Sequence, residues 1–203
     1  MTHDKHQEFF DRLADEWDLH FTAEDLERLS HLVNDLGVRE GMDILDLGCA
    51  TGVLFDLLRR RVGHQGTVTG VDFSLKMAQK AHRNFPFENV NVVDADALNL
   101  PFADAMFDMA VAFSSFPHFA DKKKALQEAH RVLKSGAALY IIHLVSSKKV
   151  TEAHHKAGGP LADDDLPTPE ELVPLFRACG FKKIEIEEHP SLFLASAVRE
   201  DKS

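Results

Sequence analysis

The chain has 203 residues, of which 44% are hydrophobic and 28% charged, an ordinary composition for one globular domain that buries a core. Its formal net charge of −10 argues against a nucleic-acid phosphate backbone as the main partner, because such partners favour basic patches. Two cysteines, Cys49 and Cys179, supply neither a disulfide framework nor a metal-ligand set, so we interpret both as small packing residues.

Two features bear on the location of the protein. The N-terminal residues are polar and charged, without the pattern of a signal peptide. The longest apolar run, residues 137–145, is interrupted by His143 and is too short to cross a bilayer. We therefore expect a cytoplasmic protein without a membrane span.

Helical signals fill the first 36 residues. Residues 5–18 carry four large apolar side chains at helical spacing, Phe9, Phe10, Leu13 and Trp17. Residues 22–36 predict a clearer helix, which Thr22 begins and Gly37 ends.

A glycine-containing turn follows in residues 42–52, MDILDLGCATG. A short apolar run ends in Asp46, two glycines follow, and an apolar-periodic segment begins at Val53, which predicts a buried strand, a tight turn and a helix. Glycine lets the backbone approach a ligand closely, and the helix presents free N–H groups to it. The turn is therefore interpreted as nucleotide-binding. The nicotinamide fingerprint G-x-G-x-x-G would need glycine at position 53, where Val53 stands.

Strand and helix signals alternate after this turn, which predicts a mainly parallel sheet with helices on both faces. The expected elements are strand 43–47, helix 53–61, strand 67–71, helix 75–84, strands 90–94 and 107–113, helix 122–133 and strand 137–143. The C-terminal part differs, because a capping box at residues 168–171 opens a helix that Gly180 ends. Residues 182–189 alternate Ile184 and Ile186 with charged residues, and residues 191–198 form an apolar strand. Together they predict an antiparallel hairpin.

Asp72 ends the expected strand 67–71, where a carboxylate can accept hydrogen bonds from the two vicinal hydroxyls of a ribose. The alternative is a carboxylate that only caps the helix beginning near Ser74. Phe73 and Met77 could add apolar contacts near an adenosine, although Met77 is equally suited to the core.

These residues resemble the motifs of the class I S-adenosylmethionine (SAM)-dependent methyltransferases. The first motif, D-x-G-x-G-x-G, is matched by Asp46, Gly48 and Gly52, with Ala50 at the middle glycine. The third motif, G-D-A-x-x-L-P-F, is matched by residues 95–102 with Ala95 in place of glycine. The family's fold has a mainly parallel seven-stranded sheet that ends in an antiparallel hairpin, as the alternation also predicts.

The resemblance implies SAM as cofactor and assigns roles to single residues. Asp96 would accept the adenine amino proton, the Ala97 backbone N–H would meet a ring nitrogen, and Asp46 would brace the turn or contact the ammonium group of the methionine part. The cofactor-binding residues implied are Asp46, Gly48, Cys49, Ala50, Gly52, Asp72, Phe73, Met77, Asp96 and Ala97.

Residues 9–18, FFDRLADEWD, resemble the aromatic N-terminal lid of the ubiquinone/menaquinone C-methyltransferase-like branch. This resemblance implies a quinone-type or other small acceptor and makes Trp17 a candidate substrate contact. An amphipathic helix that merely packs on the domain explains the same residues.

Ligands in such sheets lie beyond the carboxyl ends of the strands, which directs attention to the segments after residues 113 and 143. His118 is a candidate general base or hydrogen-bond donor, because imidazole titrates near neutrality, and a histidine that ties the loop is the alternative. His143 is a comparable candidate. Residues 144–167 are expected to form a long loop over the substrate, with His154 and His155 as further substrate contacts.

Four imidazoles and a carboxylate could converge on a divalent metal, namely His118, His143, His154, His155 and Asp165. Their spacing matches no regular metal motif, so no metal is assigned.

We expect a single domain over residues 1–203. Its expected parts are N-terminal helices or lid (1–36), SAM-binding core (40–143), substrate-side loop (144–167), and C-terminal helix and hairpin (168–203). The expected activity is methyl transfer to a small-molecule acceptor by in-line displacement, in which the protein aligns the reactants and excludes water. A non-catalytic SAM- or metal-binding regulator using residues 143–165 is the alternative. The sequence indicates no oligomeric state.

Overall fold

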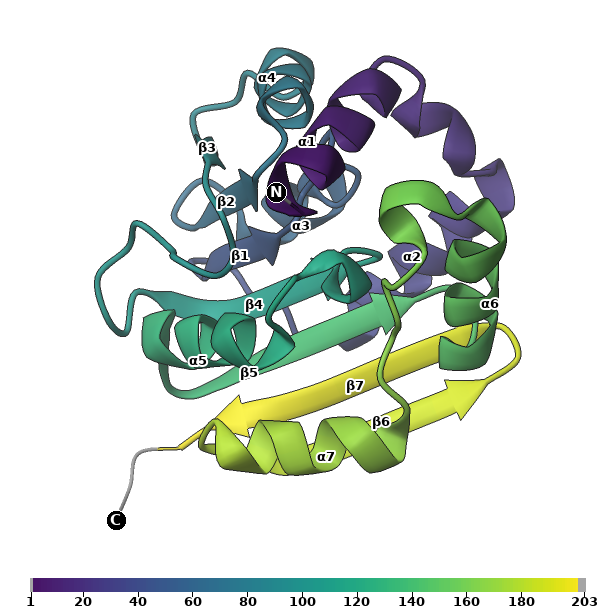
Figure 1. The fold of residues 1–203 in the computed structure, drawn as a ribbon. Coiled ribbons are helices and arrows are strands. Elements are labelled where there is room, and N and C mark those ends of the chain that lie inside the picture. Colours follow the sequence, from purple (N-terminus) through teal and green to yellow (C-terminus); the bar gives the residue numbers. More distant parts are fainter. Residues whose placement is uncertain (1, 201–203) are drawn as a thin grey trace.

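A computed structural model of the chain describes residues 2–200 and gives the side chains of residues 5–200. Within this range one sheet has the strand order β3-β2-β1-β4-β5-β7-β6 (Figure 1). Strands β1 to β5 run parallel, and β7 lies antiparallel between β5 and β6. The strands are β1 Asp43–Leu47, β2 Thr67–Asp72, β3 Val90–Asp94, β4 Phe107–Phe113, β5 Leu133–His143, β6 Phe181–His189 and β7 Leu192–Arg199. The predicted fold class, including the C-terminal hairpin, is confirmed.

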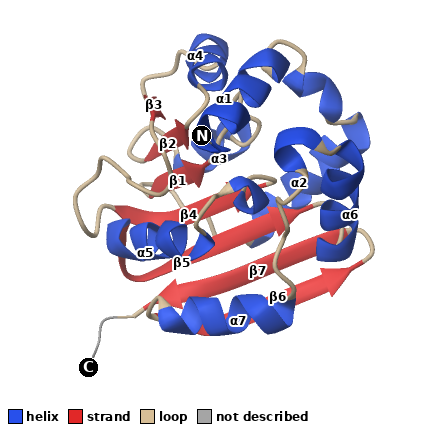
Figure 2. Cartoon of the chain, viewed as in Figure 1, coloured by secondary structure: helices blue, strands red, loops and turns tan. Residues whose placement is uncertain are grey.

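Helices cover both faces of the sheet, as Figure 2 shows. The α-helices are α1 Thr2–Leu13, α2 Ala23–Asp35, α3 Phe55–Val62, α4 Leu75–Asn84, α5 Lys122–Val132, α6 Ser147–Ala157 and α7 Pro169–Ala178. Short 3-10 helices are η1 Trp17–His20, η2 Phe116–His118 and η3 Gly159–Leu161.

Two hydrophobic layers result from the alternation of side chains along the strands. Leu45 and Leu47 of β1 face a layer with α5 and α7, whereas Ile44 faces a layer with α2 and α3. A third, smaller cluster joins Phe10 of α1 and Ala14 of the following turn to Met77 of α4 and to η3. The N-terminal segment is therefore packed against the domain.

Gly70 in β2 allows a close contact beneath the turn that follows β1. A Cβ built at Gly70 would lie 2.4 Å from Cζ of Phe55 and 2.7 Å from Sγ of Cys49. The ring of Phe55, the first residue of α3, is fully buried there. Cys49 and Cys179 are both buried free cysteines, as their interpretation as packing residues requires.

The structure corrects the expectation that residues 144–167 form a loop, because they contain α6 and η3. Ser146 caps α6 by accepting from the Lys149 backbone N–H, and Gly158 ends the helix with a φ of 65°. The helix has a weak apolar pattern with Val150 as its one buried hydrophobic side chain, so sequence periodicity did not reveal it.

Three boundaries also differ from expectation. The N-terminal pattern is divided into α1 and η1 by a turn at residues 14–16. Strand β5 begins at Leu133 instead of residue 137, because Leu133 pairs with Phe107 before a register shift, after which Ala138 pairs with Met109. Helix α3 begins at Phe55, because residues 51–54 belong to the turn. Among residues 2–200, no helix combines the length and apolar character needed to cross a membrane.

Gly70→Ala is expected to lower the free energy of unfolding by about 1–3 kcal/mol, because the added methyl group overfills the contact between β2 and α3. Urea unfolding of purified protein measures this loss. In the Phe55→Leu background, which removes the ring, the same substitution should cost less. An equal cost in both backgrounds would show that Phe55 does not set the constraint.

Candidate functional site

The turn after β1 is held in a conformation that favours glycine. Gly48 and Gly52 have φ of 72° and 91°, and Ala50 between them also has a positive φ, 47°. The backbone N–H groups of Gly48 and Cys49 both donate to the Val71 carbonyl at 2.9 Å. These two bonds fix the turn to the end of β2.

Ser115 closes the other side of the turn. The Ser115 hydroxyl donates to the Leu47 carbonyl at 2.5 Å. A Cβ built at Gly48 would lie only 2.5 Å from the Cβ of Ser115. Gly48 is thus required for close approach as well as for conformation. The turn lies between the carboxyl ends of β2 and β4, where an open parallel sheet binds ligands.

Asp72 joins this turn to the start of α4. One carboxylate oxygen accepts from the Ala50 N–H at 2.8 Å and the other from the Ser74 N–H at 2.9 Å. Burial raises the pKa of Asp72 to about 6, against the lowering effect of these two bonds. Asp72 therefore contacts the start of α4, as the helix-capping alternative expects, and it also lines the cavities beside the turn.

Asp46 is a buried carboxyl group beside the turn. Its side chain is 2% exposed and has no hydrogen-bond partner among the described residues. Burial first, and then the charge of Asp72, raises the pKa of Asp46 to about 8. A cation near this group would reverse the effect, because an opposite charge favours the carboxylate.

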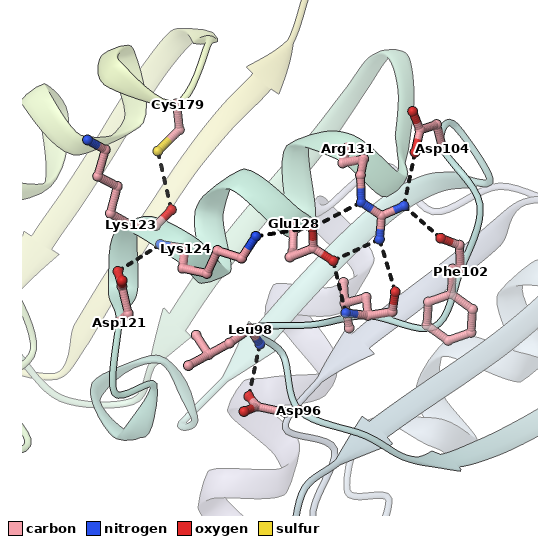
Figure 3. A network of polar contacts seen from close by, with 11 residues as sticks. Asp96, Leu98, Phe102, Asp104, Asp121, Lys123, Lys124, Glu128, Arg131 and Cys179 are labelled. Atoms are coloured by element: carbon pink, nitrogen blue, oxygen red, sulfur yellow. Dashed lines mark hydrogen bonds and ion pairs between the residues drawn. The ribbon is translucent and has the colours of Figure 1, made fainter.

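The loop after β3 carries Asp96 and is braced from α5, as Figure 3 shows. Asp96 accepts from the Leu98 N–H at 2.9 Å. Glu128 accepts from the Leu100 N–H at 2.9 Å, and Arg131 donates to the carbonyls of Leu100 and Phe102 at 3.0 and 2.6 Å. Glu128 and Arg131 also bond each other, so one charged pair fixes the whole loop.

Three cavities adjoin one another near the turn, and two of them border it. One of about 240 Å³ has Asp72, Phe73, Asp96 and Ala97 in its wall. A second of about 320 Å³ lies among η1, β4, β5 and α6, with His143, His154 and Trp17 in its wall. A narrow cavity of about 50 Å³ shares residues with both and is lined by Asp46, Gly48, Cys49, Ala50 and Met77. His118 lines all three cavities.

The N-terminal segment roofs the narrow cavity. The Phe10 ring is buried and makes edge-on contacts with Phe73, Trp17 and His118, with centroids 5.8, 5.8 and 5.0 Å apart. Lys80 of α4 holds this segment by donating to the Ala14 and Asp15 carbonyls at 2.9 Å. The segment thus packs on the domain and also covers the site.

Polar bonds fasten the two ends of the roof. At one end Asp11 accepts from the Ser74 hydroxyl at 2.6 Å. At the other Asp18 accepts from the Thr51 hydroxyl at 2.5 Å and pairs with Lys80 at 2.9 Å.

The histidines do not converge as one group. Asp164 accepts from Nδ1 of His118 at 2.6 Å and from Nε2 of His6 at 3.0 Å. Nδ1 of His154 lies 2.6 Å from the Asp164 carbonyl, and the His154 ring is 4.9 Å from that of His118. Among the described residues, no group of three or more His, Cys, Asp or Glu is arranged to hold a metal.

His143 and His155 occupy opposite environments. His143 is 4% exposed, and its Nε2 is buried without a hydrogen-bond partner among the described residues. Burial lowers the pKa of His143 to about 3. His155 instead pairs with Asp165 at 2.8 Å on the surface and lines none of the three cavities, so the structure does not bring it to the site.

Of the residues that the sequence suggested for the cofactor, Asp46, Gly48, Ala50, Asp72 and Asp96 line the narrow cavity or the cavity of about 240 Å³, whereas Gly52 lines neither. Sequence reasoning missed the partner of His118. Asp164 stands 46 residues from His118, and the run of three aspartates at 163–165 gives no sign of which one turns inward. Ser115 and His6 were also missed, because their contacts with Gly48 and Asp164 depend on tertiary structure.

The chain is similar in sequence to known methyltransferases. Residues 45–141 match the model of a methyltransferase domain. The chain is 30% identical to a demethylmenaquinone methyltransferase of Staphylococcus haemolyticus over 179 residues, covering 77% of this chain and 75% of that protein. It is 41% identical to a 2-phytyl-1,4-naphtoquinone methyltransferase of Nostoc sp. over 110 residues, 52% of this chain and 48% of that protein. The chain thus spans about half the length of several curated relatives it matches.

Solved structures share the fold. A chain in the complex between the Haloferax volcanii Trm112 methyltransferase activator and a putative methyltransferase aligns with a TM-score of 0.81 at 20% identity, covering 95% of this chain and 98% of that one. A SAM-dependent methyltransferase from Thermotoga maritima aligns with a TM-score of 0.74 at 22% identity, covering 97% and 99%. At these identities the likeness is one of fold.

The raised pKa of Asp46 predicts a pH dependence of stability. The folded pKa of about 8 exceeds the ordinary 3.8, so the folded chain retains a proton that the unfolded chain has lost in this window, and stability falls as pH rises through it. Asp46→Asn resembles the neutral form and should lose less stability between pH 5 and pH 8 than the parent. Urea unfolding at both pH values measures the difference. Parallel pH dependence in the two proteins would contradict a protonated Asp46.

Proposed function

The chain belongs to the class I SAM-dependent methyltransferases, in their quinone C-methyltransferase-like branch, and on this premise we propose that it transfers a methyl group from SAM to a small-molecule acceptor. The observation that carries the proposal is the buried Asp46 carboxyl group, left without a partner at a glycine turn that Asp72 braces. An ammonium group is the partner that such a site lacks.

The residues around the turn fit SAM from end to end. Asp96 and Ala97 would hold the adenine in the cavity of about 240 Å³, and Asp72 would hold the ribose with the lone pairs left by its two backbone bonds. The methionine part would lie in the narrow cavity lined by Gly48 and Ala50, beside Asp46, whose carboxylate would face the ammonium group. Phe73 and Met77 supply apolar contacts, and Met77 is also part of a buried cluster.

Bound SAM supplies an electrophilic methyl group on a sulfonium centre, which an acceptor removes by in-line displacement. The chain's own part is alignment and the exclusion of water. The roof formed by Phe10 and Trp17 serves the second purpose, because its rings cover the narrow cavity between the two larger ones. We therefore assign the N-terminal segment as a lid.

The acceptor would occupy the cavity of about 320 Å³ on the far side of His118. Its position next to the narrow cavity supports turnover over the alternative of a regulator that binds SAM without reacting. The named activities of the relatives, on demethylmenaquinone and 2-phytyl-1,4-naphtoquinone, favour a quinone-type or other small acceptor.

The cofactor site is tested by calorimetric titration with S-adenosylhomocysteine. The parent is expected to bind, and Asp72→Ala should weaken binding by roughly tenfold or more, because two hydroxyl partners lose a charged acceptor, each such bond contributing about 1.5–3 kcal/mol. Asp72→Asn, which preserves the shape of the side chain, should fall between them.

Asp35→Ala is the matched control, because Asp35 is an exposed aspartate at the end of α2, remote from the three cavities. Its affinity should equal that of the parent. A folded parent that does not bind S-adenosylhomocysteine would overturn the proposed function.

A further inference from the structure

His118 and Asp164 form a buried hydrogen-bonded pair at the meeting point of the three cavities. Nδ1 of His118 lies 2.6 Å from Oδ2 of Asp164, and the exposed fraction of each side chain is 11%. Because an ionised carboxylate only accepts, the proton of the imidazole lies on Nδ1. The lone pair of the neutral ring is then on Nε2, which has no hydrogen-bond partner among the described residues.

The surroundings of His118 favour its neutral form. Burial lowers the pKa of His118 below its ordinary value, while Asp164 opposes this effect and His154 and His6 add to it. The titratable groups that face it are His6 of α1, Asp164, His154 of α6 and His143 at the end of β5, and Asp46 and Asp72 line the same narrow cavity. A neutral imidazole with a free Nε2 is able to accept a proton.

The cavity beside His118 has the walls of a site for a flat, hydroxylated ring. Trp17, Phe21 and Phe113 contribute aromatic surface to it. The only polar atom in its wall that is buried without a partner in the described part of the chain is Nε2 of His143. Such an atom indicates a ligand that forms a hydrogen bond there, since a buried polar group without one is costly.

We propose that His118, positioned by Asp164, is the general base that removes the proton of an aromatic hydroxyl group on the acceptor. This inference rests on the proposed function. His118 is the catalytic residue and Asp164 the positioning residue.

The step balances in atoms and charge. The hydroxyl O–H bond breaks, its proton forms an N–H bond with the Nε2 lone pair, and oxygen keeps the bonding electrons. The resulting phenolate shares its electron pair with the methyl carbon, through oxygen or a ring carbon, as the carbon–sulfur bond breaks and sulfur keeps that pair. The imidazolium then releases its proton to water.

His6 connects this pair to the lid. It belongs to α1 and bonds both oxygens of Asp164 at 3.0 Å, so the carboxylate is held from the lid and from η2 together. The packed N-terminal segment therefore also helps to fix the orientation of the base.

The test compares two phenols that differ in acidity, with transfer measured from SAM carrying a radioactive methyl group at mildly alkaline pH. On phenol, which is neutral there, His118→Gln should lower kcat by about 100-fold or more, the range of a lost general base. On 4-nitrophenol, which is already ionised, the loss should be small. Asp164→Asn should show the same selectivity, because an amide N–H facing Nδ1 favours the opposite tautomer.

Two controls and one spectroscopic readout accompany the rates. Asp165→Asn and His31→Gln change surface residues of the same types, and both should react like the parent on both phenols. The two control variants should bind S-adenosylhomocysteine like the parent, and His118→Gln and Asp164→Asn should retain binding, because Asp46, Asp72 and Asp96 would make the polar contacts with the cofactor. Nitrogen NMR of the S-adenosylhomocysteine complex should show the Nδ1–H tautomer of His118 in the parent and its loss in Asp164→Asn.

The outcomes separate this inference from the proposed function. Binding of S-adenosylhomocysteine without transfer to either phenol, equal losses on both phenols, or an Nε2–H tautomer in the parent would each overturn the general-base assignment alone. Absence of S-adenosylhomocysteine binding by the folded parent would overturn the proposed function and this inference together.

Discussion

The site depends on one buried carboxylate that joins two parts of the backbone. Asp72 accepts from the N–H of Ala50, inside the glycine turn, and from the N–H of Ser74, which caps α4. Each bond satisfies a backbone group at a strand end, where neither the sheet ladder nor a helix supplies a partner. Since Gly48 and Cys49 also bond the Val71 carbonyl, the turn, β2 and the start of α4 form one rigid unit. The lid is fastened to this unit through Asp11 and Ser74.

This arrangement has an electrostatic cost that explains its chemistry. Burial raises the pKa of both Asp46 and Asp72, and the charge of Asp72 raises the pKa of Asp46 further. A ligand with hydroxyl groups for one carboxylate and a cation for the other relieves that cost on binding. Burial of these carboxyl groups is unfavourable in the ligand-free fold, so relief of that cost contributes to the free energy of ligand binding. Perturbed pKa values of this kind are common at functional sites.

Sequence patterns predicted those features whose conformation depends on residues close together in the chain. The turn with Gly48 and Gly52 and the strand-end Asp72 were all visible because spacing along the chain fixes their roles. Helix α6 was not, since its stability comes from the Ser146 cap and from packing of Val150 instead of a full apolar face. The pairing of His118 with Asp164 was also invisible, because it joins η2 to the segment before α7 through tertiary structure alone.

The proposed cofactor site depends mainly on local sequence, whereas the proposed acceptor site depends on tertiary structure. Residues that would hold SAM lie within one stretch of alternating strands and helices, where short motifs suffice to position them. Residues around the acceptor come from η1, β4, β5 and α6, so their arrangement depends on the lid, on the weakly patterned α6 and on Asp164 between them. Because His6 and His118 share the carboxylate of Asp164, the acceptor cavity takes its shape only when the N-terminal segment is in place. Changes in these segments can alter the acceptor without disturbing the cofactor turn, which is how one fold comes to serve many acceptors.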